Sequence, residues 1–238
     1  MNLRVRFLLL ILLLVIFLAG FYRYGRGWWF PVYASIRGEK TVASVVADTE
    51  LKGLGLSPSE QKWVRELTLI GLKEERKVEV WGSDENGRQE LIRSYPFLGY
   101  SGRLGPKLRE GDGQIPEGLY RIEYLNPNSS YHLSIKIDYP NEFDREQGQN
   151  DGRDRLGFDI FIHGNSVTVG CIPIGDDAIE DLFTLVAQVG QSRVSVIVAP
   201  WDFRTREDQP SIDGIEWEGE LYQLLRDELR RFGKSTSS

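Results

Sequence analysis

The hydrophobic pattern separates a short N-terminal segment from the rest of the chain. Phe7 to Phe21 is apolar without interruption, and the basic residues Arg4 and Arg6 precede it. A basic start followed by a short apolar run is typical of an export signal, whereas a helix that spans a bilayer usually needs about 20 apolar residues. No good cleavage site for a signal peptidase follows the run. We therefore expect residues 1–24 to be a signal peptide or, in preference, an uncleaved anchor helix.

Residues 25–56 show little periodicity and are expected to form an arm that connects this segment to one domain at residues 57–238. Trp28 and Trp29 lie where aromatic side chains would mark a membrane interface. Ser57 and Glu60 have the spacing of a capping box, which predicts the start of a short helix.

Short segments rich in apolar and β-branched residues dominate the domain and predict strands. A charged turn at residues 73–76 and the hairpin signal Asn86-Gly87 separate the first three of them, which predicts a meander. The expected strands span residues 67–72, 77–81, 88–95, 118–124, 132–139, 158–163 and 194–199.

Two helices with one apolar face are expected to pack on this sheet. The first follows a capping-box pattern at Asp177 and Glu180 and stops at Gly190. The second lies near the C-terminus, where an apolar stripe runs from Trp217 to Phe232. The polar residues 144–154 are expected to form a mobile loop just before the strand that ends at His163, with a lid over the site as a candidate role. His132 is expected to sit on a strand as an ordinary polar residue.

Composition limits the chemistry that the domain can perform. The chain has one cysteine and two histidines, which excludes a disulfide framework and cysteine-rich metal sites. The first forty residues hold six basic side chains and one acidic one, so the net charge of −6 conceals a more acidic body. An acidic body argues against nucleic acid as a partner. We expect neither a metal nor another cofactor.

The scarce reactive residues come together in one short segment. Cys171, the only cysteine, lies eight residues after His163, with Gly164 and Gly170 between them. A cysteine nucleophile needs a base within hydrogen-bond reach, and a loop returning from a strand that ends at His163 would provide one. A lone cysteine is also a common buried core residue. The residues by themselves leave both interpretations open.

The same segment resembles the active-site signature of the L,D-transpeptidase catalytic domain (YkuD-type) family. The resemblance rests on Ile162-His163-Gly164 and on Val169-Gly170-Cys171-Ile172-Pro173. Upstream, residues 113–120 resemble the family's Thr-Pro-x-Gly-x-Phe/Tyr segment. The resemblance covers residues 65 to 204 and implies a mainly β fold, a β-sandwich or barrel with a few packed helices behind the N-terminal anchor helix.

The resemblance also implies roles for the residues of the signature. His163 would be the base, Cys171 the nucleophile, and the carbonyl of Gly164 would orient the imidazole. Backbone N–H groups at Gly170 and Cys171 would stabilise an oxyanion. Ser166 and Thr168 are expected to line the pocket, and no metal is implied.

The signature departs from the usual family pattern at one point. Val169 stands where the family has a second histidine, and the loop is short, as in a branch that also includes envelope hydrolases. The resemblance thus implies a transpeptidase that forms an acyl-enzyme on diaminopimelate-containing stem peptides of peptidoglycan, with a role in cell-wall biogenesis and cell shape. A hydrolase that cleaves L,D or lipoprotein–peptidoglycan linkages stays open, as does a non-catalytic peptidoglycan-binding module. The domain is expected in the periplasm, anchored in the inner membrane, with an outer-membrane lipoprotein as a further candidate partner.

Overall fold

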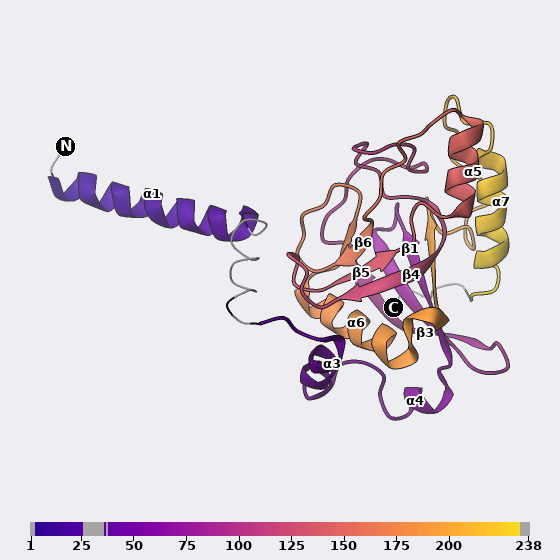
Figure 1. Ribbon diagram of the computed structural model, residues 1–238, viewed down its shortest axis with the longest axis horizontal. Coiled ribbons are helices and arrows are strands. Elements are labelled where there is room, and N and C mark those ends of the chain that lie inside the picture. Colours follow the sequence, from indigo (N-terminus) through magenta and orange to yellow (C-terminus); the bar gives the residue numbers. More distant parts are fainter. Residues whose placement is uncertain (1–2, 26–35, 37, 234–238) are drawn as a thin grey trace.

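The computed structural model describes residues 3–25, 36 and 38–233, and its strands form one open, curved sheet (Figure 1). The strand order is β3-β2-β1-β8-β4-β5-β6-β7. Parallel pairs occur at β1–β8 and β6–β7, and the other neighbours are antiparallel. The strands are β1 (Glu66–Leu72), β2 (Lys77–Ser83), β3 (Gln89–Pro96), β4 (Gly118–Asn126), β5 (Ser134–Ile137), β6 (Phe161–His163), β7 (Ile172–Pro173) and β8 (Val194–Ala199). The predicted fold is confirmed in part: a single mixed sheet, curved into a half-barrel, carries several helices, where a mainly β sandwich or barrel was expected.

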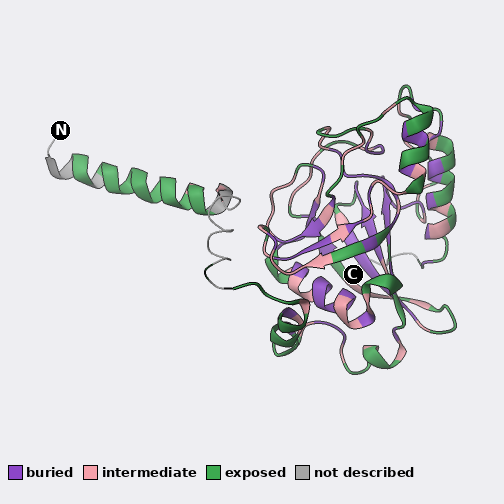
Figure 2. Cartoon of the chain, viewed as in Figure 1, coloured by how far each residue is buried: buried purple, intermediate pink, exposed green. Residues whose placement is uncertain are grey.

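Alternation along the strands places apolar side chains on both faces of this sheet. On β1, Leu67 and Leu69 belong to one hydrophobic cluster, while Ile70 and Leu72 belong to a second one on the opposite face. Helix α6 (Asp176–Val189) packs on the first cluster, and the buried residues along the helix are coloured purple in Figure 2. Helix α7 (Glu218–Leu229) packs on the second.

Two helices lie where the sequence predicted irregular chain. Helix α3 (Val42–Glu50) forms within the connecting arm and packs against α6, where the hydroxyls of Thr49 and Thr184 are 2.6 Å apart. Helix α5 (Glu142–Asn150) replaces most of the expected polar loop and lies beside α7 in Figure 1. The rings of Phe143 and Trp217 meet there at 5.7 Å between centroids.

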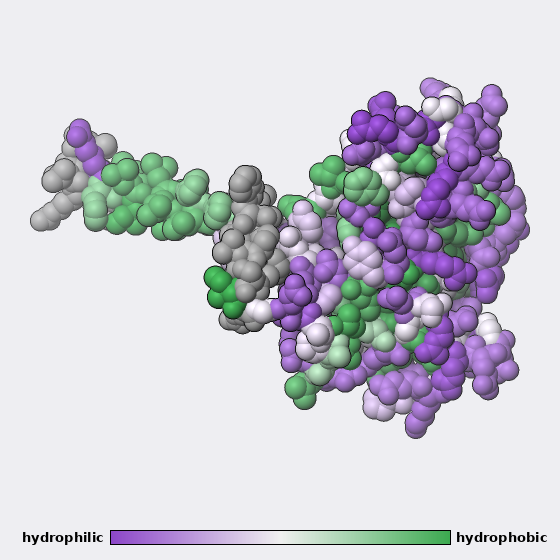
Figure 3. Space-filling view, in the orientation of Figure 1, coloured by the Kyte–Doolittle hydropathy of each residue, from purple (hydrophilic) through white to green (hydrophobic). Residues whose placement is uncertain are grey.

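The N-terminal segment forms helix α1 (Leu3–Tyr24), whose described apolar side chains are mostly exposed (Figures 2 and 3). Among the described residues, no helix combines the length and the apolar character needed to cross a membrane. Trp28 and Trp29 lie outside the described residues. The short helix predicted at Ser57 is present as α4 (Glu60–Trp63), and Ser57 and Glu60 form the reciprocal hydrogen bonds of a capping box.

A buried ion pair fixes the long loop between β3 and β4, residues 97–117, to the body. The ammonium of Lys73 lies 2.8 Å from a carboxylate oxygen of Glu117, and both side chains are fully buried. The hydroxyl of Tyr222 on α7 donates to the other oxygen of Glu117 at 2.9 Å. Burial lowers the pKa of Lys73, and the charge of Glu117 opposes that change. Because breaking such a pair would leave a buried charge uncompensated, the end of the loop is fixed to the segment after β1 and to α7.

Candidate active site

Strands β6 and β7 bring the predicted nucleophile and the predicted base to the same face of the sheet. His163 is the last residue of β6 and lies opposite Pro173 of β7. One step earlier on each strand, Ile162 lies opposite Ile172, so Cys171, just before β7, comes opposite Phe161. Side chains two positions apart on a strand share a face. By this register Cys171 and His163 are diagonal neighbours across the paired chains.

The His163 imidazole is buried and has a defined tautomer. Its Nδ1 lies 2.5 Å from the carbonyl oxygen of Gly164, which can only accept, so Nδ1 carries the proton and Nε2 is left as a proton acceptor. Burial lowers the pKa of His163, against weaker opposite effects of the Gly164 carbonyl and the Asp176 carboxylate. The ring is thus neutral near pH 7 and can serve as a base. The ring of Tyr131 lies over it, 4.7 Å between centroids.

The Cys171 thiol is half-buried and lies outside both hydrophobic clusters. It donates to the backbone carbonyl of Asp159 at 3.7 Å between sulfur and oxygen. Burial raises the pKa of the thiol, and the N–H of Phe161 and the charge of Lys107 oppose that rise only in part. The residue at rest is therefore a protonated thiol.

The thiol of Cys171 and the imidazole of His163 each have a hydrogen-bond partner in the backbone. The hydrogen bonds of the described residues include none between the thiol of Cys171 and the imidazole of His163. Burial disfavours both charged forms, so the resting pair is neutral thiol and neutral imidazole. The sulfur must turn from the carbonyl of Asp159 toward Nε2 before it can lose its proton.

The backbone amides expected to bind an oxyanion already have hydroxyl partners. The N–H of Gly170 donates to Oγ of Ser101 at 2.7 Å, across 69 positions of sequence. The N–H of Cys171 donates to Oγ1 of Thr168 at 2.9 Å, and this hydroxyl donates back to the carbonyl of Cys171 at 2.7 Å. A substrate oxyanion would have to displace these hydroxyl oxygens. Thr168 thus stabilises the turn that presents Cys171, besides any contact that it makes with substrate.

Two glycines permit the close approach of backbone that this arrangement needs. Gly170 has φ +101°, and a Cβ there would lie 2.9 Å from the carbonyl oxygen of Gln114. At Gly164, a Cβ would lie 2.5 Å from Oδ1 of Asp176 and 2.6 Å from the carbonyl oxygen of Tyr131. Ser166, also expected to line the pocket, is half-buried in the same turn, and its N–H donates to the Asn165 side chain.

Replacing Gly164 with alanine is expected to destabilise the domain by about 1–3 kcal/mol, because the added methyl group must displace packed backbone and a carboxylate. Thiol reactivity should fall as well, since the carbonyl that orients His163 moves. Urea unfolding and alkylation rates would measure both effects. Gly219→Ala is the matched control, because Gly219 is an exposed residue in the first turn of α7 and a Cβ there meets no atom within 4 Å. Equal unfolding free energies for the two variants would contradict the prediction.

Sequence reasoning missed three neighbours of the site: Ser101, Tyr131 and Asp176. Asp176 begins helix α6, and its Oδ1 accepts the N–H of Asn165, which fixes the turn after His163. All three act through contacts that the fold creates, and no local motif marks them. Within the described part of the chain, no three His, Cys, Asp or Glu side chains converge as metal ligands would.

Comparison with known proteins identifies relatives of the chain. Residues 69–198 match the family model of the L,D-transpeptidase catalytic domain (YkuD). "Putative L,D-transpeptidase YafK" of Escherichia coli K12 is 36% identical over 135 residues, which cover 54% of this chain and 52% of that protein. The chain thus matches about half the length of its curated relatives.

The solved structures that match the chain include those of two bacterial proteins. The helical cell shape determining protein Pgp2 of Campylobacter jejuni gives a TM-score of 0.48 at 17% identity, with 70% of each chain covered. Bd1075 of Bdellovibrio bacteriovorus gives a TM-score of 0.42 at 20% identity, with 74% of this chain and 59% of that chain covered.

Proposed function

The chain belongs to the L,D-transpeptidase catalytic domain family, and on that premise we propose that its domain is a cysteine-dependent acyltransferase that joins stem peptides of peptidoglycan. Cys171 is the nucleophile, His163 is the base, and Gly164 orients the base through its carbonyl. The stem peptide is attacked at the diaminopimelate carbonyl that joins an L-centre to a D-residue.

The register of β6 with β7 is the observation that carries this proposal. The pairing of Ile162 with Ile172 and of His163 with Pro173 supports it, because Cys171 directly precedes β7 and comes two positions from His163 along the paired strands. The tautomer of His163 leaves Nε2 as the acceptor, and the thiol is half-buried and within reach of solvent. A cysteine kept only for packing would need neither feature.

The reaction proceeds by proton transfer and acyl transfer. The thiol proton moves to Nε2 of His163, and the thiolate attacks the peptide carbonyl. The oxyanion replaces the hydroxyls of Ser101 and Thr168 as the hydrogen-bond acceptor of the N–H groups of Gly170 and Cys171. Each of these amides stabilises the transition state by roughly 3 kcal/mol. The imidazolium then protonates the departing amine of the D-residue. A thioester on Cys171 remains, and an acceptor amine resolves it to a new peptide bond.

The fate of the thioester distinguishes the proposed transferase from a hydrolase of the same family. Purified protein would be incubated with tetrapeptide muropeptides, with lipoprotein-linked sacculi and with an amine acceptor, and the products analysed by mass spectrometry. We expect cross-linked or acceptor-bearing products. Shortened muropeptides or released lipoprotein, without acceptor products, would replace transfer with hydrolysis. If neither a product nor a covalent adduct with a carbapenem forms, the result would favour a non-catalytic binding module.

The proposed site of action is the periplasmic face of the cell envelope, with residues 1–24 as the inner-membrane anchor. Members of the family act on peptidoglycan in the envelope, and new cross-links there would affect cell shape. The anchor rests on the sequence pattern of basic and apolar residues. Fractionation of cells with and without residues 1–24 tests it, because an anchored protein should sediment with membranes and its truncated form should not. Full-length protein in the soluble periplasmic fraction would instead indicate a cleaved signal peptide.

A further inference from the structure

The aromatic ring of Tyr131 covers the base of the proposed site. Its centroid lies 4.7 Å from that of the His163 ring, with 33° between the planes. Tyr131 is 40% exposed, and the described residues give its phenolic hydroxyl no hydrogen bond. The ring face is therefore its contact with the site. An aromatic face restricts rotation of the imidazole beneath it and favours the cationic form that follows proton transfer.

The backbone just after Tyr131 is hydrogen-bonded to the residue that follows β6. The N–H of Tyr131 donates to Oγ of Ser129 at 3.1 Å, and the N–H of Gly164 donates to the carbonyl of Leu133 at 3.2 Å. His132 has φ +75°, in the left-handed region, which corrects its predicted place on a strand. Such a backbone needs support from its surroundings.

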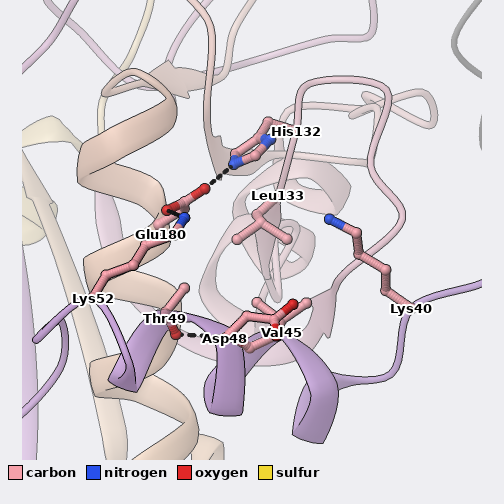
Figure 4. Close-up of a pocket in the computed structure, with 8 residues that line it drawn as sticks. All are labelled: Lys40, Val45, Asp48, Thr49, Lys52, His132, Leu133 and Glu180. Carbon is pink, nitrogen blue, oxygen red and sulfur yellow. Dashed lines mark hydrogen bonds and ion pairs between the residues drawn. The ribbon is translucent and has the colours of Figure 1, made fainter.

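His132 receives that support from a hydrogen bond to Glu180 (Figure 4). Its Nε2 lies 2.8 Å from Oε1 of Glu180 on α6, and Oε2 of Glu180 forms an ion pair with the ammonium of Lys52, just after α3, at 2.7 Å. The side chains of His132 and Glu180 are 25% and 17% exposed, so the contact is largely shielded from solvent. Burial alone would raise the pKa of Glu180, but its hydrogen bonds to Lys52 and His132 lower it.

The chain of contacts thus runs from the connecting arm to the active site. Lys52 of the arm reaches Glu180, Glu180 reaches His132, and the next residue, Tyr131, covers His163. A small cavity of about 50 Å³ lies between α3 and this ion pair, lined on the arm side by Lys40, Val45 and Asp48. Helix α6 supports this region at two points: Asp176 at its start accepts the N–H of Asn165, and Glu180 one turn later contacts His132.

We propose that Tyr131 is a positioning residue for the His163 base, and that the His132–Glu180 pair, braced by Lys52 of the arm, holds Tyr131 over the imidazole. This inference rests on the proposed function, because it assumes that His163 deprotonates Cys171. It adds to that function a role for the membrane-proximal arm, whose helix α3 supports the geometry of the base without touching substrate.

The test measures how fast iodoacetamide alkylates Cys171 in the full-length protein between pH 5 and pH 10. Tyr131→Phe keeps the ring face and should stay within about twofold of the parent protein. Tyr131→Leu should react about tenfold more slowly at pH 7 and approach the parent rate at high pH, where hydroxide removes the proton instead. Glu180→Gln should shift the profile in the same direction by a smaller factor.

Control variants separate this inference from the proposed function. Glu228→Gln makes the same change at the end of α7, where Glu228 forms an exposed ion pair with Arg231 just beyond the helix, and should leave the profile unchanged. Circular dichroism checks that each variant is folded, and Glu180→Gln keeps the inference testable if Tyr131→Leu does not fold. Profiles of Tyr131→Leu and Glu180→Gln that overlay the parent would overturn the inference. If His163→Asn also overlays the parent, the proposed base itself fails.

Discussion

Replacing Cys171 with alanine is expected to abolish covalent modification and product formation, by at least about 10⁴-fold. Cys171 is the only cysteine of the chain, so the variant offers no second thiol to a carbapenem or to a stem peptide. Intact-mass spectrometry after incubation with the carbapenem measures the adduct directly. The muropeptide assay measures turnover on the same sample.

Folding should survive this change, which makes the result interpretable. Cys171 is half-buried and outside the hydrophobic clusters, so loss of its sulfur leaves little empty volume in the core. Cys171→Ser is the matched variant, because its hydroxyl preserves the size and polarity of the position while being a far weaker nucleophile near neutral pH. Products formed by either variant at the parent rate would contradict a cysteine acyl-enzyme.

The sequence predicts the strands of the sheet wherever apolar alternation is bounded by a recognisable turn. Alternating apolar residues and a glycine turn mark β1, β2 and β3, and the turn at Gly87 has the positive φ that its Asn-Gly sequence predicts. Strand β7 has two residues and exists because β6 pairs with it. No pattern of alternation can be detected over two residues, so this strand could not be predicted.

The two missed helices lack the apolar stripe that identifies a packed helix. Helix α3 turns Val45 and Thr49 inward, and a hydroxyl pair with Thr184 replaces an apolar contact. Helix α5 is polar along most of its length, although Asn141 and Asp144 form a capping box that the sequence contains. Helix α6 was predicted, but it starts after Gly175 at φ +90° and has no capping side chain at Asp177.

The sequence alone predicts which two residues are candidates for the site, but it does not predict the residues that surround them. Cys171 and His163 are conspicuous because their residue types are scarce and close in sequence. Ser101, Tyr131 and Asp176 reach the site from other segments, and their contacts exist only once the chain has folded. The neutral resting state also depends on burial, which raises the pKa of the thiol and lowers that of the imidazole. In the proposed mechanism, proton transfer from the thiol to the imidazole therefore accompanies the attack on the substrate.

Replacing His163 with asparagine is expected to slow acylation of Cys171 by about 10²–10⁴-fold at pH 7. The asparagine amide can still donate to the carbonyl of Gly164, as Nδ1 does now, so that the turn keeps its hydrogen bond. What the variant loses is Nε2, the acceptor for the thiol proton. Comparison of circular dichroism melting curves would check that the fold is retained.

The difference in rate between the parent protein and His163→Asn should depend on pH. Because burial lowers the pKa of His163, the parent protein keeps its base unprotonated into mildly acidic solution and should remain reactive there. In His163→Asn the thiolate forms by its own ionisation, and burial raises that pKa above its usual value. The variant's rate should therefore rise about tenfold per pH unit below the thiol pKa, and the gap to the parent should narrow toward alkaline pH. A gap that stays constant from pH 6 to pH 10 would mean that His163 supports the structure of the site and does not remove the proton.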